Sequence, residues 1–250
     1  MARDFTAVSS DKLSVNVAVR TAYPLSLSIW FNSDDVTGTY ALMDIADTAV
    51  DDDDWLLLIQ GGVAGDPVDF NTRQLGTSDA ARTTTGYTAG TWFHALGTGA
   101  SSTSRACYLN GGGKGTATTD LTPASLDRTA IGIRSRAGDS LRLAGLAAEC
   151  AIYSVALSDA EALMLANGLH PYSIQAGNLA GYWPVYGHAS PEVDWSGGGN
   201  NMTVAGTTVA DHVYTAPPLR QAVGWRGALT AAAANPAYQP WYHRAPVLAQ

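Results

Sequence analysis

The sequence predicts an all-β protein in which two antiparallel sheets pack together as a sandwich. About a dozen short segments with strand character follow one another, and they do not alternate with helices as they would in a parallel sheet. The 250 residues include 26 glycines and only 14% charged residues, a composition typical of a chain with many turns. A single short helix is expected, near residue 160.

Strands are expected where apolar residues recur at every second position, because such residues share one face of a strand. Segments 13–19 and 25–31 show the clearest alternation. Further strands are expected at 40–45, 55–60, 68–72, 91–98, 105–109, 129–133, 143–153, 179–184 and 201–204. Asn110-Gly111 follows one of these strands and predicts a tight hairpin, because both residues accept positive φ.

The expected helix follows directly on the strand at 143–153. Ser158 is a good N-cap, and Glu161 three residues later completes a capping box that satisfies two backbone donors. Gly168 is placed where the helix needs a residue that accepts the left-handed conformation. The strand and the helix together indicate an architecture rather than a chemistry.

Charge and composition exclude several classes of function. The net charge of −8 and the pI near 4.9 argue against a nucleic-acid partner, which requires a basic surface. No apolar run approaches the roughly 18 residues of a membrane span. The first five residues lack the layout of a secretion signal, so we expect synthesis in a cytoplasm. Cys107 and Cys150 are predicted to be buried, reduced thiols.

The composition changes after about Asp211, and the sequence predicts two parts: a sandwich over residues 1–212 and an extended arm over residues 213–250. The arm is rich in proline and aromatic residues and shows no alternation. Its aromatic side chains would be costly to leave in water, so we expect them to dock on the same sandwich or on a neighbouring subunit. The candidate docking residues are Trp225, Tyr238, Trp241 and Tyr242.

Several of these segments resemble the laminin G-like group of concanavalin A-type jelly rolls, over most of residues 1–210. The segments that carry the resemblance, in the family's order, are Ile29-Trp30-Phe31, Thr91-Trp92-Phe93-His94, Cys107-Tyr108-Leu109-Asn110-Gly111, Ile131-Gly132 and the strand and helix at 143–161. The resemblance implies a two-sheet antiparallel jelly roll. It also implies that His94 is a structural, hydrogen-bonded histidine.

A later segment gives a narrower resemblance. Tyr182-Trp183-Pro184, followed by Asp194 and the glycine- and asparagine-rich stretch 197–204, is similar to a unit found in laminin G-like proteins encoded among phage virion genes. This resemblance implies a non-enzymatic protein on the virion surface, and an auxiliary capsid (decoration) protein in particular. Its partners would be the major capsid protein or tail proteins, together with sister subunits.

Two alternatives remain open. The first is a glycan-binding adhesion module, with or without calcium, that aids attachment to a host. Aromatic rings near expected loops, at Trp55, Tyr87 and Trp195, are candidate platforms for a sugar. The second and more distant alternative is a glycoside hydrolase, since concanavalin A-type folds include such enzymes.

A retaining glycoside hydrolase needs two carboxylates about 5 Å apart, as acidic residues two positions apart on a strand supply. The run of aspartates at 51–54 predicts a solvated loop instead, because adjacent strand residues point to opposite faces. Asp44 and Asp47 are three positions apart and do not share a face, and Glu149 lies alone in an apolar strand. No serine lies in a Gly-x-Ser-x-Gly context. The sequence therefore predicts no enzyme.

Calcium is the one metal for which ligands are available, because loop carboxylates and carbonyl oxygens are the groups that it prefers. The candidate ligands are Asp51, Asp52, Asp53 and Asp54, and the acidic pair Asp34-Asp35 is a further candidate. The alternative is that these aspartates only keep the protein soluble. No other cofactor is expected.

Overall fold

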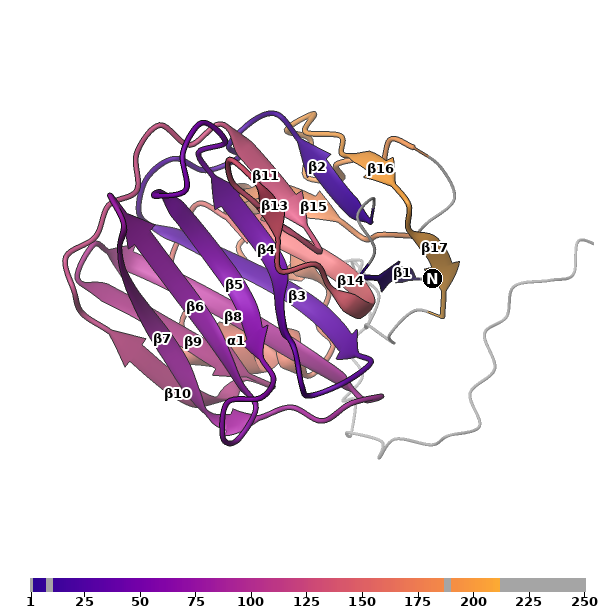
Figure 1. Cartoon of the computed structure of the whole chain (residues 1–250), viewed down its shortest axis with the longest axis horizontal. Helices are drawn as coiled ribbons and strands as arrows, with labels where there is room; N and C mark the ends of the chain where they lie inside the picture. The colour runs from indigo at the N-terminus through magenta and orange to yellow at the C-terminus, as the bar shows by residue number, and fades with distance from the viewer. Residues whose placement is uncertain (1, 8–10, 187–189, 212–250) are drawn as a thin grey trace, which may run out of the picture. The chain divides into compact units, whose positions relative to one another are not determined.

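The computed structural model describes residues 2–7, 11–186 and 190–211, and these residues form the expected antiparallel sandwich (Figure 1). The first sheet has eight strands. Across the sheet they are β10 (Gly112–Ala117), β9 (Ser104–Leu109), β8 (Trp92–Ser101), β3 (Leu25–Ser33), β14 (Ala144–Tyr153), β1 (Ala2–Thr6) and β17 (Thr208–Ala210), and β15 (Leu179–Trp183) pairs with the second half of β14.

The second sheet has seven strands. Across the sheet they are β16 (Thr203–Ala205), β2 (Lys12–Val15), β11 (Arg128–Ile131), β4 (Thr39–Ala46), β5 (Asp54–Gln60), β6 (Pro67–Gln74) and β7 (Thr77–Gly86). A small separate hairpin joins β12 (Arg134–Ser135) to β13 (Asp139–Ser140). The helices are α1 (Asp159–Ala166) and two short 3-10 helices, Pro171–Ser173 and Ala176–Asn178.

The main core lies between the two sheets. Alternation in β3 directs Leu27, Ile29 and Phe31 into this core, where they belong to the same cluster as Trp55 and Leu57 of β5. Each of these five side chains is fully buried. The apolar alternation that predicted the strands is therefore the pattern that holds the two sheets together.

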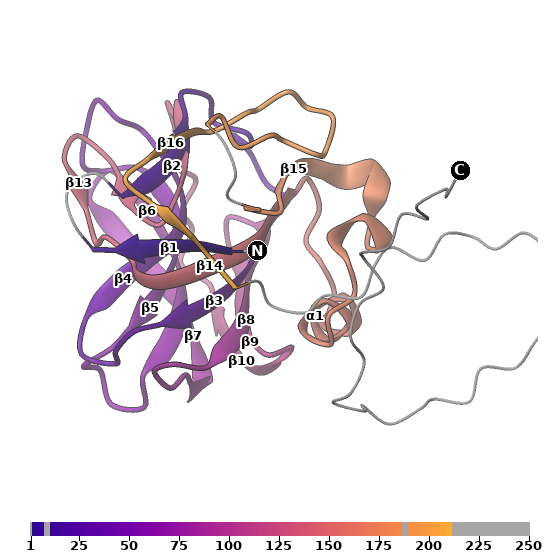
Figure 2. The same ribbon diagram turned by 90° about the vertical axis from the view of Figure 1, so that its right-hand side faces the viewer.

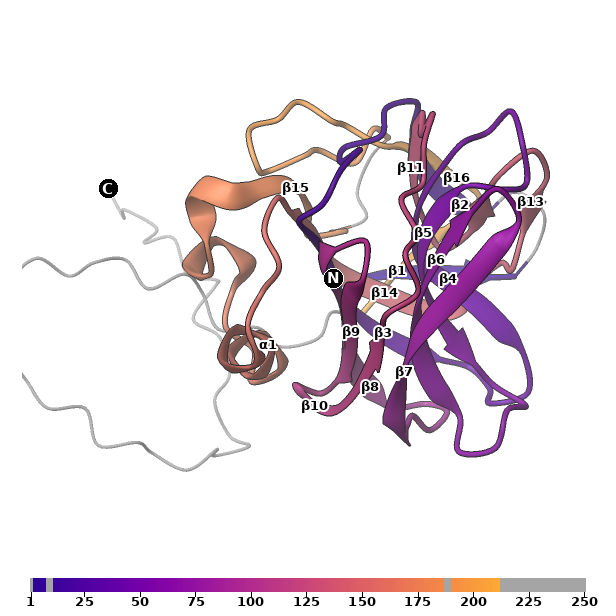
Figure 3. The same ribbon diagram turned by 90° about the vertical axis from the view of Figure 1, so that its left-hand side faces the viewer.

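Each sheet has an outer face, and a different element covers each one. Figures 2 and 3 show α1 against the outer face of the eight-stranded sheet, and the β12–β13 hairpin on the far side of the seven-stranded sheet. Ala162 and Leu165 of α1 pack in a second apolar cluster with Leu96 and Tyr108 of the eight-stranded sheet. The hairpin contacts β4 and β11, and Leu141, which follows it, packs on Leu56 and Leu58 of β5, whereas Arg82 of β7 is exposed.

The helix begins and ends as expected. The Ser158 hydroxyl accepts the backbone N–H of Glu161, and the Glu161 side chain accepts the backbone N–H of Ser158 at 2.8 Å. Gly168 has a φ of 83°. Both halves of the capping box and the glycine after the helix are therefore confirmed.

The first expected strand is shorter than the alternation predicted. Strand β2 ends at Val15, and Val17 is 48% exposed. The predicted arm, residues 213–250, lies outside the described residues. No helix among the described residues is long and apolar enough to cross a membrane.

Candidate functional site

A row of hydrogen-bonded polar side chains crosses the outer face of the seven-stranded sheet from β4 to β7. The Arg82 guanidinium donates to both carboxylate oxygens of Asp69, from Nε at 2.9 Å and from Nη2 at 2.8 Å. Gln60 Nε2 donates to the same carboxylate at 3.0 Å, and Thr39 Oγ1 donates to Gln60 Oε1 at 3.2 Å. We call Thr39, Gln60, Asp69 and Arg82 the polar row.

The polar row combines a buried carboxylate with an exposed guanidinium. Asp69 is almost fully buried, whereas the Arg82 side chain is 47% exposed. The hydrogen bonds from Arg82 to Asp69 raise the pKa of the guanidinium, and a two-pronged pair of this kind fixes the guanidinium plane. An arginine has five N–H donors, so those not directed at Asp69 remain for a ligand.

Beside the polar row, the β12–β13 hairpin closes over two buried carboxylates. Asp44 of β4 and Asp54 of β5 lie on the same outer face, diagonally across the strand pair. Arg134 Nε donates to Asp54 Oδ2 at 2.7 Å, and the backbone N–H of Ser135 donates to Asp44 Oδ2 at 2.6 Å. The hairpin is thus attached to the sheet through these two carboxylates.

The environment of the two carboxylates changes their titration. Burial raises the pKa of Asp44 well above its usual range, and the neighbouring Asp54 carboxylate raises it further. Burial also raises the pKa of Asp54, against the opposing effect of the Arg134 guanidinium. Two close carboxylates with raised pKa values share protons as a unit.

The structure disperses the four aspartates that were considered for calcium. Asp51 is exposed and lies 3.6 Å from Arg136, and Asp52 is partly exposed and lies 3.9 Å from Arg73. Asp53 accepts backbone N–H groups on both carboxylate oxygens.

Asp54 pairs with Arg134, so the expectation of a solvated loop over the whole run is wrong for Asp53 and Asp54, which are buried. Within the described residues, no group of three or more His, Cys, Asp or Glu side chains is placed to hold a metal.

Two of the three aromatic candidates for a sugar platform are in the core. Trp55 is fully buried and meets Tyr23 edge to face at 5.3 Å between ring centres, and Tyr87 is 2% exposed. These two expectations are wrong, because Trp55 points inward from β5 and Tyr87, although it lies in the loop after β7, packs in the main core. Trp195 is 46% exposed and packs edge to face on Tyr186.

The expectation that Glu149 lies alone in an apolar strand is wrong. Glu149 lies in a bulge of β14 with a φ of 52°, and its carboxylate accepts the hydroxyl of Tyr182 from β15. That same hydroxyl lies 2.9 Å from His170 Nε2. The partners come from elements that follow β14 in the chain, so a strand pattern alone cannot reveal them.

The expectations for His94, the two cysteines and the Asn110-Gly111 turn agree with the structure. His94 is buried, its Nε2 lies 2.9 Å from Ser28 Oγ, and burial lowers its pKa to about 3. Cys107 and Cys150 are buried and free. The glycine-rich segment after Asn110 forms the β9–β10 hairpin. The arm residues Trp225, Tyr238, Trp241 and Tyr242 lie outside the described part of the chain.

The model of a family described as the concanavalin A-like lectin/glucanases superfamily matches residues 7–162. No curated protein matches the sequence significantly.

Among solved structures, a Bacteroides ovatus protein proposed to bind carbohydrate is similar at 19% identity, with a TM-score of 0.63 over 84% of this chain and 59% of that one. This chain therefore spans about three fifths of that protein. A pentraxin of Limulus polyphemus, at 14% identity, has a TM-score of 0.55 over 66% of this chain and 81% of that one. The CBM40 domain of a Ruminococcus gnavus sialidase, solved with sialyllactose, is similar at 12% identity. Its TM-score is 0.54 over 66% of this chain and 98% of that one. At these identities the likeness shows the fold.

Proposed function

The chain belongs to the concanavalin A-like lectin/glucanase superfamily, and from that premise we propose that it is a non-enzymatic, lectin-like domain that binds carbohydrate. The polar row on the outer face of the seven-stranded sheet is the observation that carries the proposal. Sugar hydroxyls are recognised by a few planar polar groups held in fixed positions, and the pair of Arg82 with Asp69 is such a group. The similar Bacteroides ovatus protein, proposed to bind carbohydrate, and the similar CBM40 domain, solved with sialyllactose, support the same choice.

A binding role fits this face better than hydrolysis. The two carboxylates that share it, Asp44 and Asp54, are buried beneath the hairpin and hydrogen-bonded to Ser135 and Arg134. A glycoside hydrolase must place its two carboxyl groups on either side of the scissile bond. We therefore expect no release of reducing sugar when the protein is incubated with any glycan that it binds.

The proposal is tested on a glycan array that includes bacterial polysaccharides, followed by isothermal titration with the best ligand. Arg82→Lys keeps the charge opposite Asp69 but loses the two-pronged geometry, and we expect affinity to fall at least tenfold. Gln60→Ala is also expected to lower the affinity for the glycan.

Arg20→Ala, which alters a partly exposed arginine between β2 and β3, is the matched control and leaves affinity unchanged. No retained glycan, or full affinity in Arg82→Lys, contradicts the proposal. Chelation with EDTA tests whether calcium takes part, and an unchanged affinity rules out the calcium-dependent form.

We also propose a finer assignment, that this domain is displayed on a phage virion, as an auxiliary capsid (decoration) protein rather than a tail component. The order of segments from the strand at 143 to the stretch at 197–204 supports it. The capsid and sister subunits would then be the partners of the arm. Deletion of residues 225–250 is expected to abolish incorporation into particles, and normal incorporation contradicts a docking role for the arm.

A further inference from the structure

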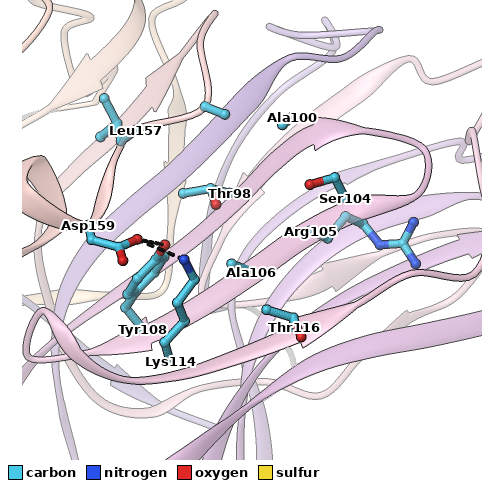
Figure 4. A pocket seen from close by; sticks show the side chains of 11 residues that line it. Thr98, Ala100, Ser104, Arg105, Ala106, Tyr108, Lys114, Thr116, Leu157 and Asp159 are labelled. Atoms are coloured by element: carbon cyan, nitrogen blue, oxygen red, sulfur yellow. Dashed lines mark hydrogen bonds and ion pairs between the residues drawn. The ribbon is translucent and has the colours of Figure 1, made fainter.

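A hollow lies on the outer face of the eight-stranded sheet, the sheet that does not carry the polar row. It is bounded by β8, β9 and β10 and by residues 156–159, which lead into α1 (Figure 4). Its volume is about 210 Å³, below the roughly 300–1,000 Å³ of pockets for drug-sized ligands. A single small ring fits it, and an extended chain does not.

The floor of the hollow is a cross-strand row of three short side chains. Thr98 of β8 is directly opposite Ala106 of β9, which in turn is opposite Thr116 of β10. The side chains therefore lie on one face, with the methyl group of Ala106 between two hydroxyls. Because strands are spaced about 4.8 Å apart, the two threonines are separated by about two strand spacings. The small central residue leaves the space.

Thr98 is the residue that points to a ligand. It is 5% exposed and lines the hollow, and among the described residues its hydroxyl has no hydrogen-bond partner. The hydroxyl oxygen itself is not fully enclosed, and its open side is the hollow, where a ligand hydroxyl can take the place of solvent. Thr116, further along the floor, is exposed and also has a hydroxyl directed to this surface.

The wall beside the floor is a fixed pair of opposite charges. Asp159 Oδ1 accepts the Tyr108 hydroxyl at 2.7 Å and Lys114 Nζ at 2.8 Å. The hydrogen bond from Lys114 lowers the pKa of Asp159 the most, and the hydrogen bond from Tyr108 lowers it further. The carboxylate therefore stays ionised. Lys114 also lies 5.4 Å from the centre of the Tyr108 ring. The wall therefore offers a carboxylate acceptor and ammonium donors side by side, with no net charge.

From this arrangement we propose that the hollow is a second binding site, and that its ligand is one neutral sugar ring. Each sugar hydroxyl both donates and accepts a hydrogen bond, which matches the hydroxyl of Thr98 and the adjacent charges of Lys114 and Asp159. An anion is disfavoured because Asp159 already neutralises Lys114, and because Arg105, the other cation of the lining, is paired with Asp79. A flat aromatic ligand is disfavoured because Tyr108 is 3% exposed and presents no open ring face. This site is separate from the polar row and does not depend on it.

The test is a titration of the isotope-labelled protein with glucose, galactose, mannose and N-acetylglucosamine, followed by amide NMR shifts. We expect at least one of these sugars to shift amides of β8, β9, β10 and residues 156–160. Thr98→Val keeps the shape of the side chain and removes the hydroxyl, and we expect the dissociation constant to rise at least fivefold with an unchanged melting temperature. Asp159→Asn, an exposed change that leaves the core intact, is expected to weaken binding similarly.

Thr203→Val makes the same substitution on β16, away from the hollow, and is the matched control. Absence of shifts at the hollow with all four sugars overturns the proposal, as does unchanged binding by Thr98→Val and Asp159→Asn. Shifts confined to Gln60, Asp69 and Arg82 also overturn it, although they support the polar row. Shifts at the hollow that survive Arg82→Lys support it even if the polar row fails its own test.

Discussion

At the scale of single residues, His94 shows how burial turns a polar side chain into a pH-dependent term in stability. It is buried in the eight-stranded sheet beside Ser28, and burial lowers its pKa from 6.5 to about 3. The unfolded chain therefore binds a proton that the folded chain excludes. Stability from this group is present above pH 6.5 and is lost as pH falls from there towards 3.

The expected result is a slope of about 1.4 kcal/mol per pH unit over that window, which His94→Gln removes. Urea unfolding of both proteins at pH 7, 6, 5 and 4 measures the difference, so that the carboxylates common to both proteins cancel. Equal slopes in the two proteins contradict the prediction.

Residue-scale reasoning from the sequence succeeded where a residue's partners are near it in the chain. The capping box of Ser158 and Glu161 and the turn at Asn110 were predicted, because the residues that form each of them are at most three positions apart in the chain. The polar row was not predicted, since Asp69 meets Arg82 only through the pairing of β6 with β7, and Thr39 meets Gln60 only through β4 and β5. Register is a property of the folded sheet, and polar residues on its outer face leave no periodic signal.

At the scale of elements, the same limit explains the strands that were missed. Strand β7 has the sequence TSDAARTTTG, in which Ala81 is the one apolar residue that reaches the core. Its strand conformation comes from pairing with β6 rather than from its own alternation. Strand β5 was predicted within one residue, because Trp55, Leu57 and Ile59 alternate towards the core.

The β12–β13 hairpin provides a prediction at this scale, because the ion pairs that attach it to the rest of the molecule differ in burial. Arg134 pairs with fully buried Asp54 at 2.6 Å, whereas Lys12 pairs with partly exposed Asp139, also at 2.6 Å. Arg134→Met leaves the buried Asp54 carboxylate with only the more distant Arg136, whose Nε lies 3.6 Å from Asp54 Oδ2, and we expect a loss of about 3 kcal/mol. Lys12→Met is the matched control, with an expected loss of no more than about 1 kcal/mol.

Denaturant unfolding at pH 7 measures both losses. The double variant Arg134→Met with Asp54→Asn is expected to recover much of the stability, because it removes the buried charge that has lost its nearer cation. Equal effects of Arg134→Met and Lys12→Met show that burial does not set the strength of these pairs in this protein.

At the scale of the whole sandwich, the two sheets come together at the edge formed by β7 and β10. A Cβ atom added at Gly115 of β10 would lie 1.7 Å from the carbonyl oxygen of Arg82 in β7. The backbones of strands from opposite sheets are therefore in direct contact there, and only glycine permits it. The same contact supports the strand that carries the exposed end of the polar row.

Gly115→Ala must push β10 and β7 apart, and overpacking of this kind costs about 1–3 kcal/mol or more. The matched control is Gly112→Ala in the same strand, where the nearest atom to an added Cβ is 3.9 Å away. We expect a clear fall in melting temperature for Gly115→Ala and almost none for Gly112→Ala. Because Arg82 moves with β7, Gly115→Ala should also weaken glycan binding while Gly112→Ala leaves it intact. A stable Gly115→Ala variant with full affinity would show that the sheets can separate at this edge without disturbing the polar row.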